Sequence, residues 1–279
     1  MRKLILKLAS FPTIRNVVIM LRLHVPANWW LRRFPVVKTL PGTDIRYRAR
    51  RLDSLCLSVM MFDRAALYST SGLPVNIRTF ADLGCNVGYF TCWLCQQAKG
   101  KELRGLMVDA NPEVIDDARW HVETNCWREI HVLQGFVGTS SPEREAEFFV
   151  NASTVFSTAV PPEQTKGFNS SWKRVVVPCV CIEQNWQKNF GDTPCDLLKL
   201  DIEGSEMDFF RNETGFLRRV QTILIEWHKW RVSLSEIEQF LTQHGFVISR
   251  ILHEEQGLGT AIFVRNASKP GDKFSTATA

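Results

Sequence analysis

Two neighbouring segments constrain most strongly how this chain folds. Residues 81–91 read ADLGCNVGYFT, a short strand that runs into a glycine turn, and residues 105–112 read GLMVDANP, a strand that ends in an acid. Glycine lets the backbone approach a ligand closely, and the helix after the turn presents free N–H groups. An acid after the second strand can accept hydrogen bonds from ribose hydroxyls. The pair therefore predicts an α/β sheet that binds a nucleoside-bearing molecule.

The glycine spacing indicates which kind of nucleoside ligand fits. Dinucleotide sites usually carry three glycines, G-x-G-x-x-G, around a diphosphate. Only Gly84 and Gly88 are present here, in a D-x-G-x-N-x-G pattern that begins at Asp82. This turn resembles the first motif of class I methyltransferases that use S-adenosylmethionine (SAM). The residues expected to bind this cofactor are Asp82, Gly84, Asn86, Gly88, Phe90, Asp109, Ala110, Asn111 and Gln134. Among them, Asp109 is expected to hold the ribose and Gln134 to reach the adenine amino group.

A later motif narrows the family. Residues 199–206 read KLDIEGSE, which resembles the K-[IL]-D-[VI]-E-G-[AS]-E signature of the FkbM family of methyltransferases. The resemblance extends from about residue 78 to about residue 264. It implies a Rossmann-like fold, SAM as the methyl donor and usually methylation of oxygen, often on glycans or secondary metabolites.

Three residues at predicted strand ends are candidates for catalysis. Asp201 and Glu203 alternate along a predicted strand, so their side chains would share one face, and His228 follows the next strand. A general base contributes typically ~10²–10⁴-fold, and the unperturbed pKa of histidine, near ~6.5, suits that role. A divalent metal held by Asp201, Glu203 and Glu226 is an alternative, but the sequence shows no full ligand set and we assign none. Glu206 is expected to stabilise the first turn of the following helix.

Strands and helices alternate from residue 78 onward, which is typical of a mostly parallel sheet. The expected strands are 79–83, 103–109, 130–133, 174–182, 196–201 and 220–226, and the expected helices are 87–98, 111–126, a helix from 205, and 233–244. A terminal antiparallel hairpin, 246–252 with 260–265, is the usual end of a class I methyltransferase sheet. Residues 139–172 break the rhythm and predict an insertion or edge hairpin near the acceptor. The expected organisation is a basic N-terminal extension (1–76), a methyltransferase domain (77–266) and a disordered tail (267–279).

Charge is unevenly distributed along the chain. Residues 1–51 hold twelve Lys and Arg against one Asp, a charge of +11, which leaves −6 for the rest of a chain whose net charge is +5. This basic arm predicts peripheral contact with an anionic membrane, with a solvated basic face as the alternative, and no specific nucleic acid. We expect no export or membrane-spanning segment, because charges interrupt each apolar run near the N-terminus. The eight cysteines are expected to be reduced thiols rather than zinc ligands, which favours a cytoplasmic location.

These features favour a SAM-dependent methyltransferase that acts on a hydroxyl of a sugar, glycan or small metabolite. N-methylation is the nearest alternative. An NAD-linked oxidoreductase and a non-catalytic protein that binds an adenosine cofactor are alternatives from other classes. The two-glycine turn and the terminal hairpin argue against the oxidoreductase. The intact motif at 199–206 argues against a protein that has lost its catalytic activity.

Overall fold

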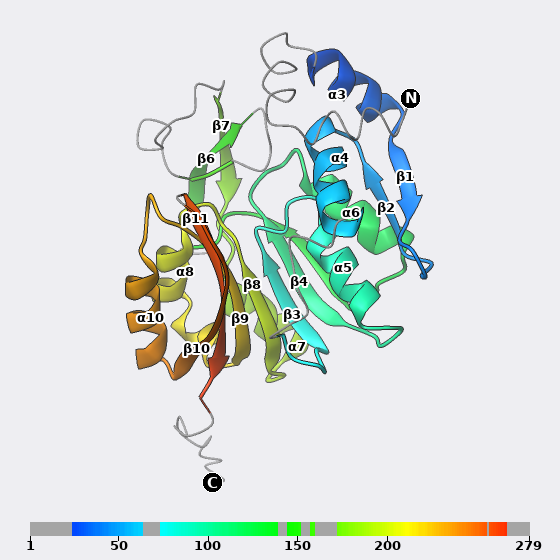
Figure 1. Cartoon of the computed structure of the whole chain (residues 1–279). Helices are drawn as coiled ribbons and strands as arrows, with labels where there is room; N and C mark the ends of the chain where they lie inside the picture. The colour runs from blue at the N-terminus through cyan, green and yellow to red at the C-terminus, as the bar shows by residue number, and fades with distance from the viewer. Residues whose placement is uncertain are drawn as a thin grey trace.

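The computed structural model describes residues 24–63, 73–138, 144–151, 157–159, 172–255 and 257–266. Within these residues, a seven-stranded sheet has the order β10-β11-β9-β8-β3-β4-β5 (Figure 1). Its strands are β3 (Thr79–Leu83), β4 (Arg104–Asp109), β5 (Ile130–Gln134), β8 (Cys195–Leu200), β9 (Val220–His228), β10 (Phe246–Glu254) and β11 (Leu258–Arg265). Strand β11 runs antiparallel to both its neighbours, and the other pairings are parallel. The predicted Rossmann-like sheet with a terminal antiparallel hairpin is confirmed.

Helices cover both faces of this sheet, so the central strands are buried on both sides. One face carries α5 (Tyr89–Gln97) and α6 (Ile115–Thr124), and their buried residues pack with Phe80 and Met107. The other face carries α7 (Ile182–Phe190), α8 (Glu206–Asn212), α9 (Thr214–Leu217) and α10 (Leu234–Gln243), which pack with Ala81 and Val108. The predicted helix at 233–244 is confirmed as α10, and a capping box between Ser233 and Glu236 begins it.

The chain reverses its direction of travel across the sheet at β3. It passes from β3 to β4 on one side, whereas β8 later pairs with the other side of β3. Ligands of open α/β sheets bind beyond the carboxyl ends of the strands at such a point. Gly84 follows β3 there with a φ of +72°, and a Cβ at this position would lie 1.6 Å from the carbonyl oxygen of Asp201. A side chain therefore does not fit at residue 84.

The described part of the N-terminal region shares the core of the main sheet. It contains α3 (His24–Arg33), β1 (Val36–Thr39) paired with β2 (Arg46–Ala49), α4 (Leu52–Ser58) and a π-helical turn η1 (Val59–Asp63). Its buried side chains Leu40, Tyr47 and Met61 belong to the same cluster as Phe80 and Tyr89. The boundary predicted at residue 76 stays a prediction, and the disordered tail predicted at 267–279 lies outside the described residues.

Part of the basic excess of this region is neutralised within the molecule. Arg48 and Arg50 both pair with Asp117 of α6, and Arg51 pairs with Glu113 at 2.6 Å. These arginines attach the N-terminal region to the sheet domain. They therefore do not belong to a basic face that is free for a partner, as the charge count alone had indicated.

The segment predicted as an insertion contributes one strand to a separate two-stranded sheet, visible in the upper part of Figure 1. Strand β6 (Glu145–Asn151) lies in the predicted insertion and pairs antiparallel with β7 (Trp172–Pro178), which begins where the predicted insertion ends. The single strand predicted at 174–182 is wrong at its end, because β7 stops at Pro178 and α7 begins at Ile182.

None of the helices in the described part of the chain has the length and the apolar run needed to cross a bilayer.

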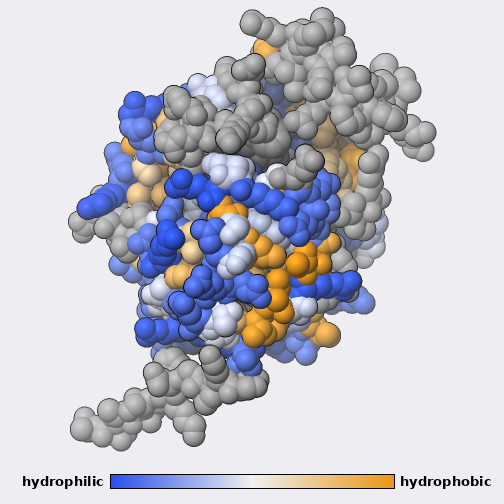
Figure 2. Space-filling model, turned by 60° about the vertical axis from the view of Figure 1, so that its left-hand side comes forward, coloured by the Kyte–Doolittle hydropathy of each residue, from blue (hydrophilic) through white to orange (hydrophobic). Residues whose placement is uncertain are grey.

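The outer edge of the sheet is exposed but carries features that hinder pairing with another strand. Edge strand β10 leaves Val247 and Ile251 exposed, and Figure 2, which turns this side of the molecule forward, shows a hydrophobic patch among hydrophilic residues. The strand also contains Arg250, His253 and Glu254, and its register against β11 is interrupted twice. Charges and bulges are two common protections of an exposed edge.

Candidate active site

A cavity of about 500 Å³ lies at the carboxyl ends of β3, β4, β8 and β9. One part of its wall comes from the glycine turn and the end of β4, and another from the residues after β8 and β9. The predicted site residues that line it are Gly84, Asn86, Phe90, Asp109, Ala110, Asp201, Glu203 and His228. The structure thus brings the predicted cofactor residues and the predicted catalytic residues to one cavity.

On the cofactor side, the backbone holds the Asp109 carboxylate in place. The backbone N–H of Asn86 donates to Oδ2 of Asp109 at 2.7 Å, and the N–H of Asn111 donates to Oδ1 at 2.8 Å. Each oxygen keeps a further lone pair for a ligand hydroxyl. Burial raises the pKa of Asp109 to about 6, although these two hydrogen bonds act in the opposite direction. A carboxylate in this position, beside a turn with no room for a Cβ at Gly84, fits the ribose of SAM.

Four predicted cofactor residues do not line the cavity: Asp82, Gly88, Asn111 and Gln134. Asp82 is fully buried, accepts a hydrogen bond from Thr91 and pairs with Lys199 at 3.5 Å. Gln134 ends β5, and the next residue, Gly135, lines the cavity instead. Their direct contact with the cofactor stays a prediction.

We expect the affinity for S-adenosylhomocysteine to depend on pH through Asp109. Ribose hydroxyls need the ionised carboxylate as acceptor, so affinity is retained above the pKa of about 6 and lost as the pH falls through it. Below that value the loss approaches about tenfold per pH unit. Calorimetric titrations between pH 7 and 5 measure it, because the α-carboxyl and α-amino groups of the ligand keep their charge over this range. The matched variant Asp109→Asn does not titrate, and an equal pH dependence in that variant would contradict the assignment.

Among the other residues that line the cavity, Asp201 and Glu203 lie in a tight turn and not on a strand. Strand β8 ends at Leu200, and Glu203 has a φ of +52°. The hydroxyl of Thr158 donates to the carbonyl oxygen of Glu203 at 2.7 Å, which fixes this turn from the insertion. The predicted reason for the proximity of the two acids, alternation along one strand, is therefore wrong, but the turn still places both at the cavity.

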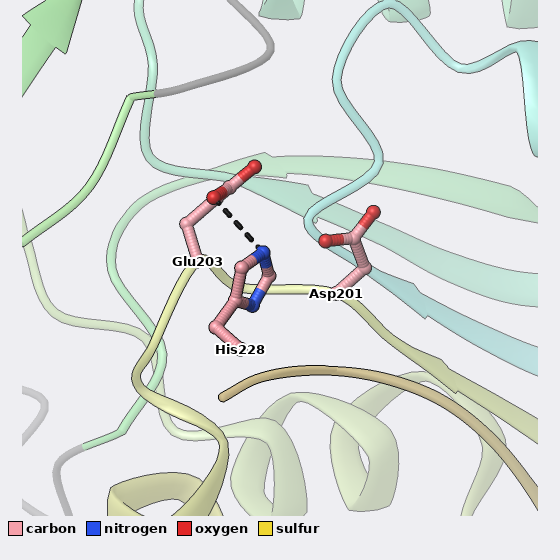
Figure 3. Close-up of side chains that lie close together, drawn as sticks. All are labelled: Asp201, Glu203 and His228. Atoms are coloured by element: carbon pink, nitrogen blue, oxygen red, sulfur yellow. Dashed lines mark ion pairs between the residues drawn. The ribbon is translucent and has the colours of Figure 1, made fainter. Parts of the chain in front are cut away.

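His228 lies between two carboxylates. Its Nε2 is 3.1 Å from Oε2 of Glu203 (Figure 3), and its Nδ1 is 3.0 Å from Oε1 of Glu206. Burial alone would lower the pKa of His228, but the two carboxylates outweigh it and raise that pKa well above 6.5. The two carboxylates therefore favour the protonated ring, in which both nitrogens donate. A general base at this position needs the neutral ring, and the predicted role of His228 as base stays a prediction.

Glu206 is the residue whose role the sequence analysis missed. It is fully buried, and its Oε1 accepts from the N–H of Gly204 as well as facing His228. It begins α8, as expected, but it also fixes the orientation of the His228 ring. The available signal in the sequence was its place as the last acid of the 199–206 motif. Its full burial also exceeds what a role at the start of a helix requires, because such carboxylates are seldom fully buried.

Lys199 connects the two parts of the cavity. Its Nζ donates to the carbonyl oxygen of Gly84 at 2.7 Å and lies 3.4 Å from Oδ2 of Asp201. The cavity also contains Glu226, where burial, followed by the charge of Asp201, raises the pKa to about 8. This shift favours a protonated Glu226, which can donate a hydrogen bond.

The Methyltransferase FkbM domain matches residues 82–248, which is more than half of the chain and contains the glycine turn, Asp109 and the acidic turn. The chain belongs to the FkbM methyltransferase family. It is therefore a SAM-dependent methyltransferase, and the predicted family and cofactor are confirmed. The NAD-linked alternative is not supported. No curated protein matches the sequence of this FkbM methyltransferase.

Several solved structures resemble this FkbM methyltransferase at low identity. Methyltransferase FkbM from Methylobacillus flagellatus has a TM-score of 0.44 and 17% identity, over 74% of this chain and 47% of that one. An O-methyltransferase family protein from Burkholderia thailandensis has a TM-score of 0.44 and 13% identity, over 77% and 58%. TrmK of M. capricolum, in complex with S-adenosylhomocysteine, has a TM-score of 0.42 and 13% identity, over 71% and 66%.

Proposed function

We propose that this FkbM methyltransferase methylates a hydroxyl oxygen of a sugar, a glycan or a small metabolite. The observation that supports the proposal most is the single cavity that joins Asp109 to the acidic turn. A carboxylate accepts strong hydrogen bonds, so Asp201 and Glu203 can bind and orient an acceptor hydroxyl there. Orientation of the acceptor supplies a large share of such a rate enhancement.

Bound SAM supplies an electrophilic methyl group, and the chain must then hold the acceptor and remove its proton. Among the charged groups of this region, Asp201 is the one that we expect to take the proton. Its Oδ1 is buried and accepts no hydrogen bond from the described residues. By contrast, two carboxylates raise the pKa of His228 well above 6.5 and favour its protonated ring, and burial raises the pKa of Glu226 to about 8 and favours its protonated carboxyl.

The aromatic part of the wall supports an acceptor whose ring has apolar C–H faces. Phe136, Trp172 and Trp230 line the same cavity as the carboxylates. A sugar presents hydroxyls at its edge and C–H groups on its faces, so polar and aromatic groups side by side suit it. Pockets that combine apolar walls with a few polar groups are typical of small-molecule sites.

The direct experiment is methyl transfer from SAM with a labelled methyl group to pooled glycans, glycolipids and metabolite extracts. Label in a product that resists both alkali and esterase, as an ether does, supports the proposal. Label found only on amine nitrogen would replace it with N-methylation. No transfer to any pool, by a protein that binds S-adenosylhomocysteine, would favour the non-catalytic alternative.

We also infer that the acceptor reaches this cavity from an anionic membrane surface. Helix α3 exposes Trp29 (69% exposed) and Trp30 (50%), and the exposed Arg33 and Phe34 lie at its end, where Arg32 pairs with Glu113 at 3.1 Å. Aromatic and basic side chains together are typical of helices that bind the lipid interface. The amide oxygen of Asn28 on α3 accepts from the N–H of Leu52 on α4. From α4 and the turn after it, Leu57 and Met61 reach the cavity wall.

We expect the double change Trp29→Ala and Trp30→Ala to weaken binding to phosphatidylserine-containing vesicles by about tenfold or more, because two interfacial aromatics are lost. Sedimentation of the full chain with vesicles measures this effect. Wild-type binding should also decrease as salt rises and be weak on phosphatidylcholine alone. Val75→Ala, an exposed apolar residue outside α3, is the control. Equal binding by the double variant and wild type would leave α3 as a solvated surface.

A further inference from the structure

We propose that the acidic end of the cavity is a divalent-cation site, with Asp201, Glu203 and His228 as its ligands. Only the purpose of the ion rests on the proposed methyl transfer, because binding of the ion can be measured without any acceptor. Figure 3 shows the three side chains pointing toward one another from the turn after β8 and from the end of β9.

The size of the cluster matches a coordination sphere. One ligand atom from each of the three residues lies within 4.8 Å of the others, and Nε2 of His228 is 3.1 Å from Oε2 of Glu203. Around an octahedral ion with bonds of ~2.1 Å, adjacent ligands lie ~3.0 Å apart and opposite ligands ~4.2 Å apart. The histidine and glutamate atoms are thus already at the spacing of adjacent ligands.

Glu206 provides a separate observation that favours an ion. A histidine that binds a metal usually donates its other ring N–H to a carboxylate, which sets the tautomer. Glu206 is fully buried and lies 3.0 Å from Nδ1 of His228, on the side of the ring away from Glu203. If Nδ1–H donates to Glu206, the lone pair of Nε2 points into the cluster. An ion that binds to Nε2 would displace the proton from this nitrogen to solvent, so the positive charge of the metal ion would take the place of the charge of the imidazolium.

Asp201 provides a second observation. Lys199 lies 3.4 Å from its Oδ2. Its Oδ1 is buried and receives no hydrogen bond from the described part of the chain. A buried carboxylate oxygen normally has a donor or a cation as its partner. The ligand atoms of this cluster are thus the Oδ1 of Asp201, an oxygen of Glu203 and the Nε2 of His228.

The ligand types indicate which ions fit and what an ion would do. One imidazole with two carboxylates suits Mn²⁺, Fe²⁺, Co²⁺ or Zn²⁺ better than Mg²⁺ or Ca²⁺, which prefer oxygen alone. An acceptor hydroxyl bound to such an ion would have a lowered pKa, so water, a weak base, would suffice to take its proton as the oxygen attacks the methyl group. In that case Asp201 is a ligand of the ion and not the proton acceptor.

The test is a titration of chelator-treated full-length protein with Mn²⁺, in which electron paramagnetic resonance measures the free ion. No SAM or acceptor is present. We expect one Mn²⁺ per chain for the wild type and at least tenfold weaker binding for Asp201→Asn and His228→Gln. Glu206→Gln should weaken binding by about 10–100-fold, although it does not touch the ion. Asp208→Asn is the matched control: it lies on α8 beside the site, is partly exposed and pairs with Arg211.

The affinity for S-adenosylhomocysteine shows that each variant is folded. Absence of saturable Mn²⁺ binding by a wild type that binds S-adenosylhomocysteine would overturn the inference and leave Asp201 as the proton acceptor. An equal loss in Asp208→Asn would also overturn it, because binding would then be nonspecific. Saturable binding that the three site variants lose supports the inference, even if no hydroxyl acceptor is found.

Discussion

Replacing Asp109 by alanine is expected to weaken the binding of S-adenosylhomocysteine by about a hundredfold or more, since the ribose loses a charged acceptor for two hydroxyls. The loss has a second cause. The same carboxylate accepts from the backbone N–H groups of Asn86 and Asn111, so its removal also loosens the turn that faces the ligand. Isothermal titration calorimetry measures the change.

Two comparisons separate these causes. Asp109→Asn retains one uncharged acceptor and should lose less affinity than Asp109→Ala. Asp116→Asn, on the exposed surface of α6, should bind like the wild type. Unchanged affinity in Asp109→Ala, with the fold intact, would mean that the ribose is held elsewhere in the cavity.

Asp201→Asn is expected to lower turnover by about 10²–10⁴-fold, the range for loss of a general base. The amide cannot take a proton, and it is also a poorer ligand for a cation, so the expectation holds for both roles of Asp201. Because the effect lies in the reacting state, kcat and kcat/KM should fall together. Transfer of labelled methyl groups to the acceptor found by pooled screening measures both constants.

S-adenosylhomocysteine, which lacks the sulfonium charge of SAM, should bind this variant within a few-fold of wild type. This measurement separates loss of turnover from loss of the cofactor site. Asp192→Asn, an exposed acid paired with Arg219, serves as the control and should keep its turnover. Turnover of Asp201→Asn within threefold of wild type would exclude this residue from both roles.

The sequence allowed the cofactor half of the site to be predicted because its signals are local. The glycine turn, the strand before it and the acid that ends β4 lie within about thirty residues, and each has a distinct chemical reason. Asp109 and Asn86, both predicted to bind the cofactor, line the same cavity, and the N–H of Asn86 donates to Asp109. The signal for α7 was also local, because apolar Ile182, Trp186 and Phe190 lie on one helical face. The predicted strand 174–182 nevertheless ended on the first residue of this helix.

The acidic half was predicted less well because its geometry depends on distant contacts. A strand pattern extended through residue 203 places two acids on one face. The structure ends the strand at Leu200, and the hydroxyl of Thr158, from an insertion 45 residues away, holds the turn. The contact between Glu206 and His228 spans 22 residues and leaves no periodic signal. Likewise, the charge count could not show that Arg48 and Arg50 meet Asp117.

The glycine at residue 84 has a consequence for how binding of the cofactor and binding of the acceptor influence each other. The backbone of the cofactor turn lies against the carbonyl of Asp201, and Lys199 holds both through one ammonium group. If the turn at Gly84 shifts when the cofactor binds, Asp201, which faces the acceptor, must therefore shift with it. Such coupling is reciprocal: if a bound nucleoside tightens binding of the acceptor by some factor, the acceptor must tighten binding of the nucleoside by the same factor. Release of the methylated product would then weaken the binding of S-adenosylhomocysteine. The release of both would thus be coupled through Gly84.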